Sequence, residues 1–225
     1  MNKDFVELLE RNEKHAQNLE GIKSVQDGQN PDFVTVCCSD SRVLQDHMWS
    51  NEQPGEIFTA SNIGNRVYQE EDGEKFVSGD MIYPVAHADT DTMIVVGHTG
   101  CGAVTATYQH VKGELSYDEE PKGVQRCITL LKSVVEEGVK EIPEGLSEEE
   151  EINHLVEFNV DRQVEFLINS DEIDENVDVL GVVYDLHNVY SGDHGHTAVI
   201  NINGENNVEK LKEQYSDLEK RVERL

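Results

Sequence analysis

The sequence predicts an α/β fold in which a mainly parallel central β-sheet is flanked by helices. Continuous apolar runs occur at residues 33–38, 92–97 and 178–185. Runs without polar alternation are typical of strands that are covered on both faces. Two amphipathic patterns lie between the second and third runs, and strands that alternate with helices favour a parallel sheet. At 225 residues the chain can bury one good core, so we expect residues 1–225 to form a single domain.

Helices are expected at both ends of the chain. Phe5, Leu8 and Leu9 share one face of a predicted helix, so residues 1–30 are expected to form an N-terminal helical arm. Residues 205–225 are expected to form a C-terminal helix, because apolar residues recur three and four apart in a short heptad pattern. These are Val208, Leu211, Tyr215, Leu218, Val222 and Leu225. Such a helix lies on its own domain or contacts a partner subunit, and the pattern does not distinguish the two.

Three helices are expected between the second and third strands. The alanine-rich stretch "AVTATY" begins a helix soon after the second strand. Two longer helices follow, separated by the linker "GVKEIPEGLSEEEE", and each has one apolar stripe. The stripes are Val124, Cys127, Ile128, Leu131 and Val135 in the first, and Ile152, Leu155, Val156, Val160, Val164 and Leu167 in the second.

The charge balance is strongly acidic. The chain has 18 basic and 46 acidic residues and a formal net charge of −28. A surface of this charge repels nucleic acid and anionic membranes, which we exclude as partners. Acidic runs such as "SEEEE" form an ordinary solvated face or reflect a high-salt cytoplasm in which cations screen self-repulsion. We adopt the high-salt hypothesis.

The sequence also predicts a cytoplasmic location. The first residues carry charges throughout and do not resemble a signal peptide. No apolar stretch is long enough to span a bilayer. Four cysteines in a chain of this size do not indicate a disulfide framework. There is no Cys-x-x-Cys motif, and the adjacent Cys37 and Cys38 are poorly placed to bridge, so a redox protein is not expected.

Metal-ligating residues follow two of the predicted strands. "CCSDSR" ends the first strand and "HTGC" follows the second. Because the carboxyl ends of parallel strands meet at one edge of the sheet, a cysteine, a histidine and a second cysteine can converge there. Two thiolates and one imidazole suit zinc, and three protein ligands leave a fourth position for water, as in catalytic sites. Zinc lowers the pKa of that water to about 7.

These two motifs together identify a family. "CSDSR" followed by "HTGCGAV" resembles the β-class carbonic anhydrases, and "EQPGEIF", "NIGN", "VEFNVDRQVEFL" and "GVVYD" are similar to other blocks of that family. The resemblance covers about residue 34 to residue 190. It implies one zinc ion per subunit, with Cys38, His98 and Cys101 as its ligands.

The resemblance also implies an acid–arginine pair beside the metal. Arg42 would hold Asp40 ionised through paired hydrogen bonds, and Asp40 would orient zinc-bound hydroxide. In a closed state of the family the same aspartate becomes a fourth zinc ligand. Cys37 is adjacent to Cys38 and is expected to point to the opposite side of the strand as a buried structural thiol. Cys127, on its helical stripe, is expected to be buried as well.

Two further residues are expected to bind substrate. Gln53 resembles the glutamine that hydrogen-bonds bicarbonate in the plant-like, open-site branch of the family, although a loop amide before a Pro-Gly turn is the alternative. The backbone N–H groups around Gly100 and Gly102 start a helix and suit an anion. Ser61 departs from the family pattern, which usually has arginine there, and this predicts no cooperative inhibition by bicarbonate.

The predicted function is therefore reversible hydration of carbon dioxide to bicarbonate and a proton. The resemblance implies a homodimer or a larger homo-oligomer, with sites at the subunit boundary. Hydrolysis of carbonyl sulfide or carbon disulfide on the same fold is an alternative, and a catalytically inactive zinc-stabilised binding protein is another. The residue that exports the proton is not identified among the candidates His47, His87, His110, His187, His194 and His196.

Overall fold

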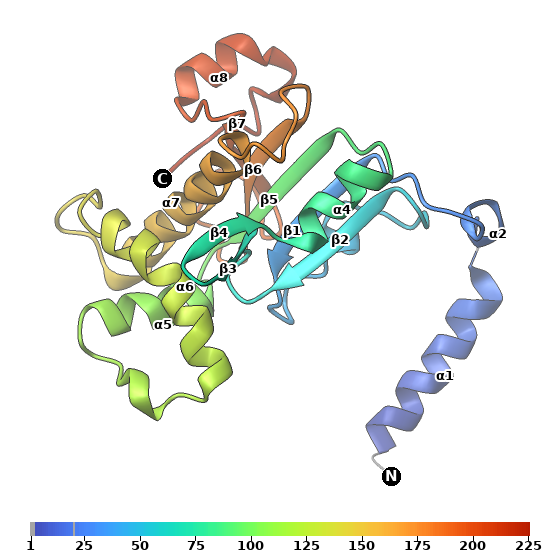
Figure 1. Ribbon diagram of the computed structural model, residues 1–225, viewed down its shortest axis with the longest axis horizontal. Coiled ribbons are helices and arrows are strands. Elements are labelled where there is room, and N and C mark those ends of the chain that lie inside the picture. The colour runs from blue at the N-terminus through green and yellow to red at the C-terminus, as the bar shows by residue number, and fades with distance from the viewer. Residues whose placement is uncertain (1–2, 20) are drawn as a thin grey trace.

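The computed structural model describes residues 3–19 and 21–225 and is built around a five-stranded sheet (Figure 1). The strand order is β2-β1-β5-β6-β7. Their bounds are β2 Ile57–Asn62, β1 Phe33–Cys38, β5 Thr92–His98, β6 Asp178–Tyr184 and β7 Thr197–Ile202. Strands β2, β1, β5 and β6 run parallel to one another, and β7 pairs antiparallel with β6. The predicted α/β fold with a mainly parallel sheet is confirmed.

Several elements were not predicted from the sequence. They are β2, β7, the helices α3 Gln45–Met48 and α4 Gly79–His87, and the two-stranded antiparallel sheet of β3 Tyr68–Glu71 and β4 Glu74–Val77. The hairpin had a recognisable signal, because Asp72 and Gly73 both have positive φ angles at its turn, and Asp-Gly is a preferred pair in tight hairpins.

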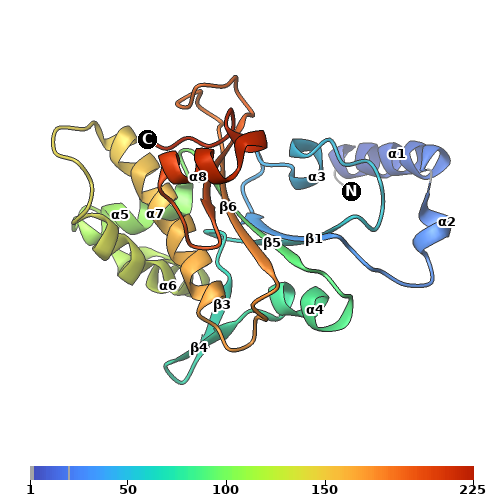
Figure 2. The ribbon, with the colours of Figure 1, turned by 90° about the horizontal axis from the view of Figure 1, so that it is seen from above.

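The longer helices lie together on one side of the sheet, and the last of them packs directly on it. α5 Gly102–Val111, α6 Lys122–Gly138 and α7 Glu148–Ile168 lie together on one side of it (Figures 1 and 2), with the short 3₁₀ turn η1 Tyr117–Glu119 between α5 and α6. The whole predicted stripe of α7 is buried, whereas Cys127 on α6 is only half-buried, so its predicted burial is wrong. None of the described helices has the length and apolarity that a membrane span requires.

The two faces of the sheet are covered unequally. Val36 and Val95 belong to the large core beneath α4 to α7. Cys37 and Ile94 alternate to the other face, where a smaller core includes half-buried Trp49. On this face the packing partners come from α3, the loops and the sheet itself. A parallel sheet is normally covered on both faces, so the second face is the less protected one.

Part of the acidic charge has a local role at the start of α7. The Ser147 hydroxyl accepts a hydrogen bond from the Glu150 N–H at 3.4 Å, and the Glu150 carboxylate accepts one from the Ser147 N–H at 2.8 Å. This capping box places four glutamates in the first turn, where they interact favourably with the helix dipole.

The N-terminal arm projects away from the sheet in both views (Figures 1 and 2). It consists of α1 Lys3–Asn18 and α2 Ile22–Val25. Phe5, Leu8 and Leu9 are each more than half exposed, at 52%, 52% and 53%. Residues 1, 2 and 20 of the predicted arm lie outside the described residues.

The predicted continuous helix over residues 205–225 is wrong. α8 Val208–Gln214 ends at Tyr215, a single 3₁₀ turn η2 Ser216–Leu218 follows, and the chain then returns to the sheet. The Val199 N–H donates to the Arg221 carbonyl at 2.8 Å beside an isolated bridge to Val222. The apolar residues of this segment thus form a small core between α8 and the edge strand β7. The contact of Val222 with β7 covers part of that sheet edge.

Candidate metal centre

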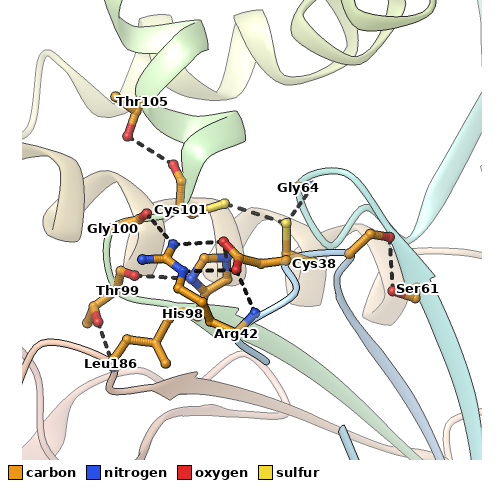
Figure 3. A network of polar contacts seen from close by, with 12 residues as sticks. Cys38, Arg42, Ser61, Gly64, His98, Thr99, Gly100, Cys101, Thr105 and Leu186 are labelled. Carbon is orange, nitrogen blue, oxygen red and sulfur yellow. Dashed lines mark hydrogen bonds and ion pairs between the residues drawn. The ribbon is translucent and has the colours of Figure 1, made fainter. Parts of the chain in front are cut away.

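Two neighbouring strands and one helix position the metal-ligating residues. Cys38 is the last residue of β1 and His98 the last of β5, and these strands are adjacent and parallel. After His98 the chain turns through Gly100, whose φ of +61° favours glycine. Cys101 then caps the N-terminus of α5. Figure 3 shows the three side chains converging.

The spacing of the ligand atoms fits a zinc ion. The sulfurs of Cys38 and Cys101 and a ring nitrogen of His98 lie within 4.8 Å of one another, and all three residues are buried. The two sulfurs are 3.9 Å apart, far longer than a disulfide bond of about 2.05 Å. Two sulfurs at about 2.3 Å from a tetrahedral zinc lie about 3.8 Å from each other.

One ring nitrogen of His98 is free to bind a metal ion. The ring is fully buried, and Nδ1 lies 3.0 Å from the Thr99 carbonyl oxygen. Because a carbonyl only accepts, Nδ1 carries the proton and Nε2 presents a lone pair. Nε2 is buried without a hydrogen-bond partner. A buried nitrogen left unpaired beside two thiols, with its other nitrogen fixed by a carbonyl, is the arrangement that metal-ligating histidines adopt.

The two thiols share one proton when no metal is bound. A hydrogen bond from Cys101, together with one from the Gly64 N–H, lowers the pKa of Cys38 to about 4 despite its burial. The hydrogen bond that Cys101 gives to Cys38, together with burial, raises the pKa of Cys101. The site therefore holds a thiolate and a thiol, and metal binding has to displace the second proton.

Asp40 and Arg42 form a two-pronged ion pair beside the cluster. Arg42 Nε donates to Asp40 Oδ1 at 2.9 Å and Nη2 donates to Oδ2 at 2.7 Å. This pairing holds the pKa of Asp40 well below its usual range. Oδ2 lies 3.8 Å from Nε2 of His98, yet Asp40 is not part of the metal-ligating group. The structure thus brings the pair next to the cluster with Asp40 turned to Arg42.

Gly102 lies at the predicted position beside the cluster, as the exposed first residue of α5. The next two N–H groups, of Ala103 and Val104, point to Cys101 and lower its pKa in part. The helix N-terminus therefore favours negative charge on the Cys101 sulfur once that sulfur loses its proton.

Gln53 does not reach the cluster in this chain. It lines a groove of about 520 Å³ with Phe33, Trp49, Ile57 and Ile94. Phe33 and Ile57 are the first residues of β1 and β2, so this groove lies at the amino ends of the strands. The connection between two parallel strands has to return to the starting edge, and Gln53 lies near the end of that return. Within one subunit Gln53 therefore lies away from the cluster, and its predicted contact with substrate stays a prediction.

Two other residues discussed from the sequence, Cys37 and Ser61, lie on β1 and β2. Cys37 belongs to the core of the opposite sheet face from Cys38, as predicted, and burial raises its pKa to about 12. The Ser61 hydroxyl lies 2.9 Å from that of Ser39, at the end of β2.

Several supporting residues were missed by the sequence interpretation. Asn153 on α7 accepts a hydrogen bond from the Gly100 N–H at 2.9 Å, which fixes the turn between the ligands. The Thr99 hydroxyl lies 2.8 Å from His187 and 3.4 Å from the buried Asp185. Thr99 could have been suspected from its place between two ligands, but the partners from distant segments carry no local signal.

A mostly parallel sheet whose strand ends gather two cysteines and one histidine beside an acid–arginine pair defines a metalloprotein with a site of the catalytic type. The chain belongs to the carbonic anhydrase family, whose model matches residues 33–192.

Among curated proteins the chain is 24% identical over 164 residues to "Beta carbonic anhydrase 5, chloroplastic" of Arabidopsis thaliana, covering 73% of this chain and 52% of that protein. A mitochondrial β-carbonic anhydrase from the same plant is 29% identical over 100 residues, which are 44% of this chain and 34% of that protein. The chain thus spans about half or less of the length of these relatives.

Solved structures share the fold. A β-carbonic anhydrase from Coccomyxa in complex with acetazolamide has a TM-score of 0.73 at 22% identity, covering 99% of this chain and 100% of that one. One of two tetrameric β-carbonic anhydrases from Sordaria macrospora has a TM-score of 0.70 at 23% identity, covering 88% and 98%.

Proposed function

We propose that this chain catalyses the reversible hydration of carbon dioxide to bicarbonate and a proton, with one zinc ion held by Cys38, His98 and Cys101. The observation that carries the proposal is the buried, unpaired Nε2 of His98 beside two sulfurs 3.9 Å apart, with Asp40 and Arg42 next to them. When bound, zinc supplies a water that is deprotonated near neutral pH, which is the nucleophile this reaction needs.

The chain's own residues would then orient the reaction. Asp40, ionised and fixed by Arg42, accepts a hydrogen bond from the attacking water and directs it toward the carbon of carbon dioxide. Arg42 also lies 3.4 Å from the Gly100 carbonyl oxygen, so the ion pair is tied to the turn that carries Cys101. The N–H groups of Gly64, Ala103 and Val104 disperse the charge of the two sulfurs. The N-terminal end of α5 at Gly102 is the side on which bicarbonate would be held.

An open resting site is part of this proposal. Arg42 donates hydrogen bonds to both carboxylate oxygens of Asp40, so a turn of Asp40 onto the metal would act against this charge-assisted pairing. Stopped-flow hydration of carbon dioxide by the zinc-loaded protein, scanned over pH in concentrated KCl, tests this. We expect activity near neutral pH. Activity confined to alkaline pH would mean that Asp40 closes on the metal. Absence of activity at every pH would overturn the function, and sulfide release from carbonyl sulfide would then identify the alternative substrate.

We infer that the chain works as a homodimer or a larger homo-oligomer. Phe5, Leu8 and Leu9 on the projecting arm are exposed, and the second sheet face near Trp49 has thin cover. Both are apolar surfaces that a second copy would bury. Sedimentation velocity of the wild type and of a Leu8→Glu, Leu9→Glu variant tests this, because the variant is expected to dissociate. A monomeric wild type would contradict the inference.

We further propose a reducing, high-salt compartment, the cytoplasm of a salt-adapted cell. The four cysteines are free, and the net charge of −28 requires screening by cations. Thermal unfolding measured from low to molar KCl is expected to show a rising midpoint. A midpoint independent of KCl would remove the support from charge.

A further inference from the structure

We propose that His187 is the group that carries the reaction's proton from the site to solvent, an inference that rests on the proposed hydration. The structure ties His187 directly to the turn that carries two of the ligands. Its Nδ1 lies 2.8 Å from the Thr99 hydroxyl, next to His98. Its ring also packs on Gly100, where an added Cβ would lie 2.5 Å from His187 Cε1. His187 itself is exposed, so one side chain contacts both the ligand turn and solvent.

The hydrogen bonds behind His187 support the assignment of its proton to Nδ1. The Asp185 side chain is fully buried and accepts the N–H groups of His187 at 3.0 Å and Tyr190 at 2.9 Å. The Thr99 hydroxyl lies 3.4 Å from Asp185 Oδ1, which can only accept when ionised, so Thr99 donates to it. Thr99 already accepts from the Leu186 N–H at 2.9 Å. Its remaining lone pair accepts from Nδ1–H of His187.

In this arrangement His187 donates to Thr99 and Thr99 donates to Asp185. Nε2 of His187 therefore keeps a free lone pair. Nε2 is thus the atom that takes the proton. Arg42 donates to the carbonyl of Gly100, the residue on which the ring packs, and it is paired with Asp40. His194 lies in the same loop, with its Nδ1 3.0 Å from the Leu186 carbonyl oxygen.

The proton balance is simple. A water O–H bond breaks at the site, and the proton passes through solvent water to Nε2 of His187, giving an imidazolium. The same N–H bond then breaks as a buffer base in solution takes the proton, and neutral His187 is restored. Proton export follows the departure of bicarbonate, so it affects kcat and leaves kcat/KM unchanged.

Kinetics of His187→Ala in dilute buffer test the proposal, with His194→Ala as the matched control from the same loop. We expect kcat of H187A to fall by about tenfold or more while kcat/KM is preserved, and added imidazole to restore kcat. H194A is expected to keep the wild-type kcat. An unchanged kcat in H187A, or a parallel fall of kcat and kcat/KM without rescue, would overturn the proposal. An inactive wild type would instead overturn the proposed function.

A second measurement does not depend on activity. Nitrogen-15 NMR of the zinc-loaded wild type is expected to show His187 protonated at Nδ1 and unprotonated at Nε2 in its neutral form. Thr99→Ser retains the hydroxyl and should keep this tautomer, whereas Thr99→Val should lose it. A wild-type His187 protonated at Nε2 would contradict the relay even if His187→Ala did not fold.

Discussion

The two ends of the same parallel strands carry different kinds of site. At the carboxyl ends of β1 and β5, the ligand atoms of the buried Cys38, His98 and Cys101 lie within 4.8 Å of one another. At the amino ends, about 16 Å away for a six-residue strand, Gln53 lines an open groove of mixed polar and apolar side chains, including Glu52 and Trp49. The first end has the burial and geometry for metal chemistry, whereas the second has no group of metal-ligating atoms among the described residues. The end of the strands at which a residue lies therefore indicates its role better than its separation in sequence from the metal-ligating residues.

The largest effect that this comparison predicts separates two adjacent cysteines. Cys38→Ala should lose zinc, and activity should fall by more than about 100-fold, because even the loss of a residue supporting a ligand costs 10–100-fold. Cys37→Ala, on the opposite face of the same strand, should retain both. Zinc content by atomic absorption and carbon dioxide hydration check this. Equal zinc content in the two variants would break the distinction between the faces.

The next effect separates metal binding from catalysis within the carboxyl edge. Asp40→Asn should keep zinc and lose about 100-fold in kcat/KM, because the neutral amide is a weaker acceptor for the attacking water. Fold and metal content are checked on the same sample by circular dichroism and metal analysis. Full activity in D40N would mean that the ion pair with Arg42 is structural only.

A smaller effect follows from the shared proton of the thiols. The pKa of Cys38 is lowered to about 4 and that of Cys101 is raised, so at pH 7 one thiol proton remains to be displaced. At about pH 6, below the pKa of about 7 of zinc-bound water, zinc binding should release about one thiol proton. Calorimetry in buffers of different ionisation enthalpy measures the proton count. Release of two protons at that pH would contradict the coupling of the two thiols.

The smallest effect is expected at the amino edge. Gln53→Ala should leave zinc content and the affinity for bicarbonate unchanged, because Gln53 lies at the opposite edge from Cys38. Bicarbonate inhibition of the hydration reaction measures this. Weakened inhibition in Q53A, with the assembly intact, would mean that a second subunit presents its glutamine to the site.

The sequence predicted the carboxyl edge well because its information is local. Cys38, His98 and Cys101 each end a strand or begin a helix, so apolar runs and a short motif suffice to bring them together. The position of Gln53 could not be predicted, because it depends on how the chain returns to begin β2, a strand that was not predicted. The continuous C-terminal helix failed for a related reason, since Val222 prefers the edge of β7 to another helical turn. The contacts of Thr99 and Asn153 join distant segments and leave no pattern in the chain.

The most direct test of the central claim, that the carboxyl edge holds a zinc centre built from Cys38, His98 and Cys101, is the zinc K-edge X-ray absorption spectrum of the metal-loaded protein. The account predicts two sulfur neighbours at about 2.3 Å and two nitrogen or oxygen neighbours at about 2.0–2.1 Å. A zinc ion with no sulfur neighbours, or with three or more, would contradict it.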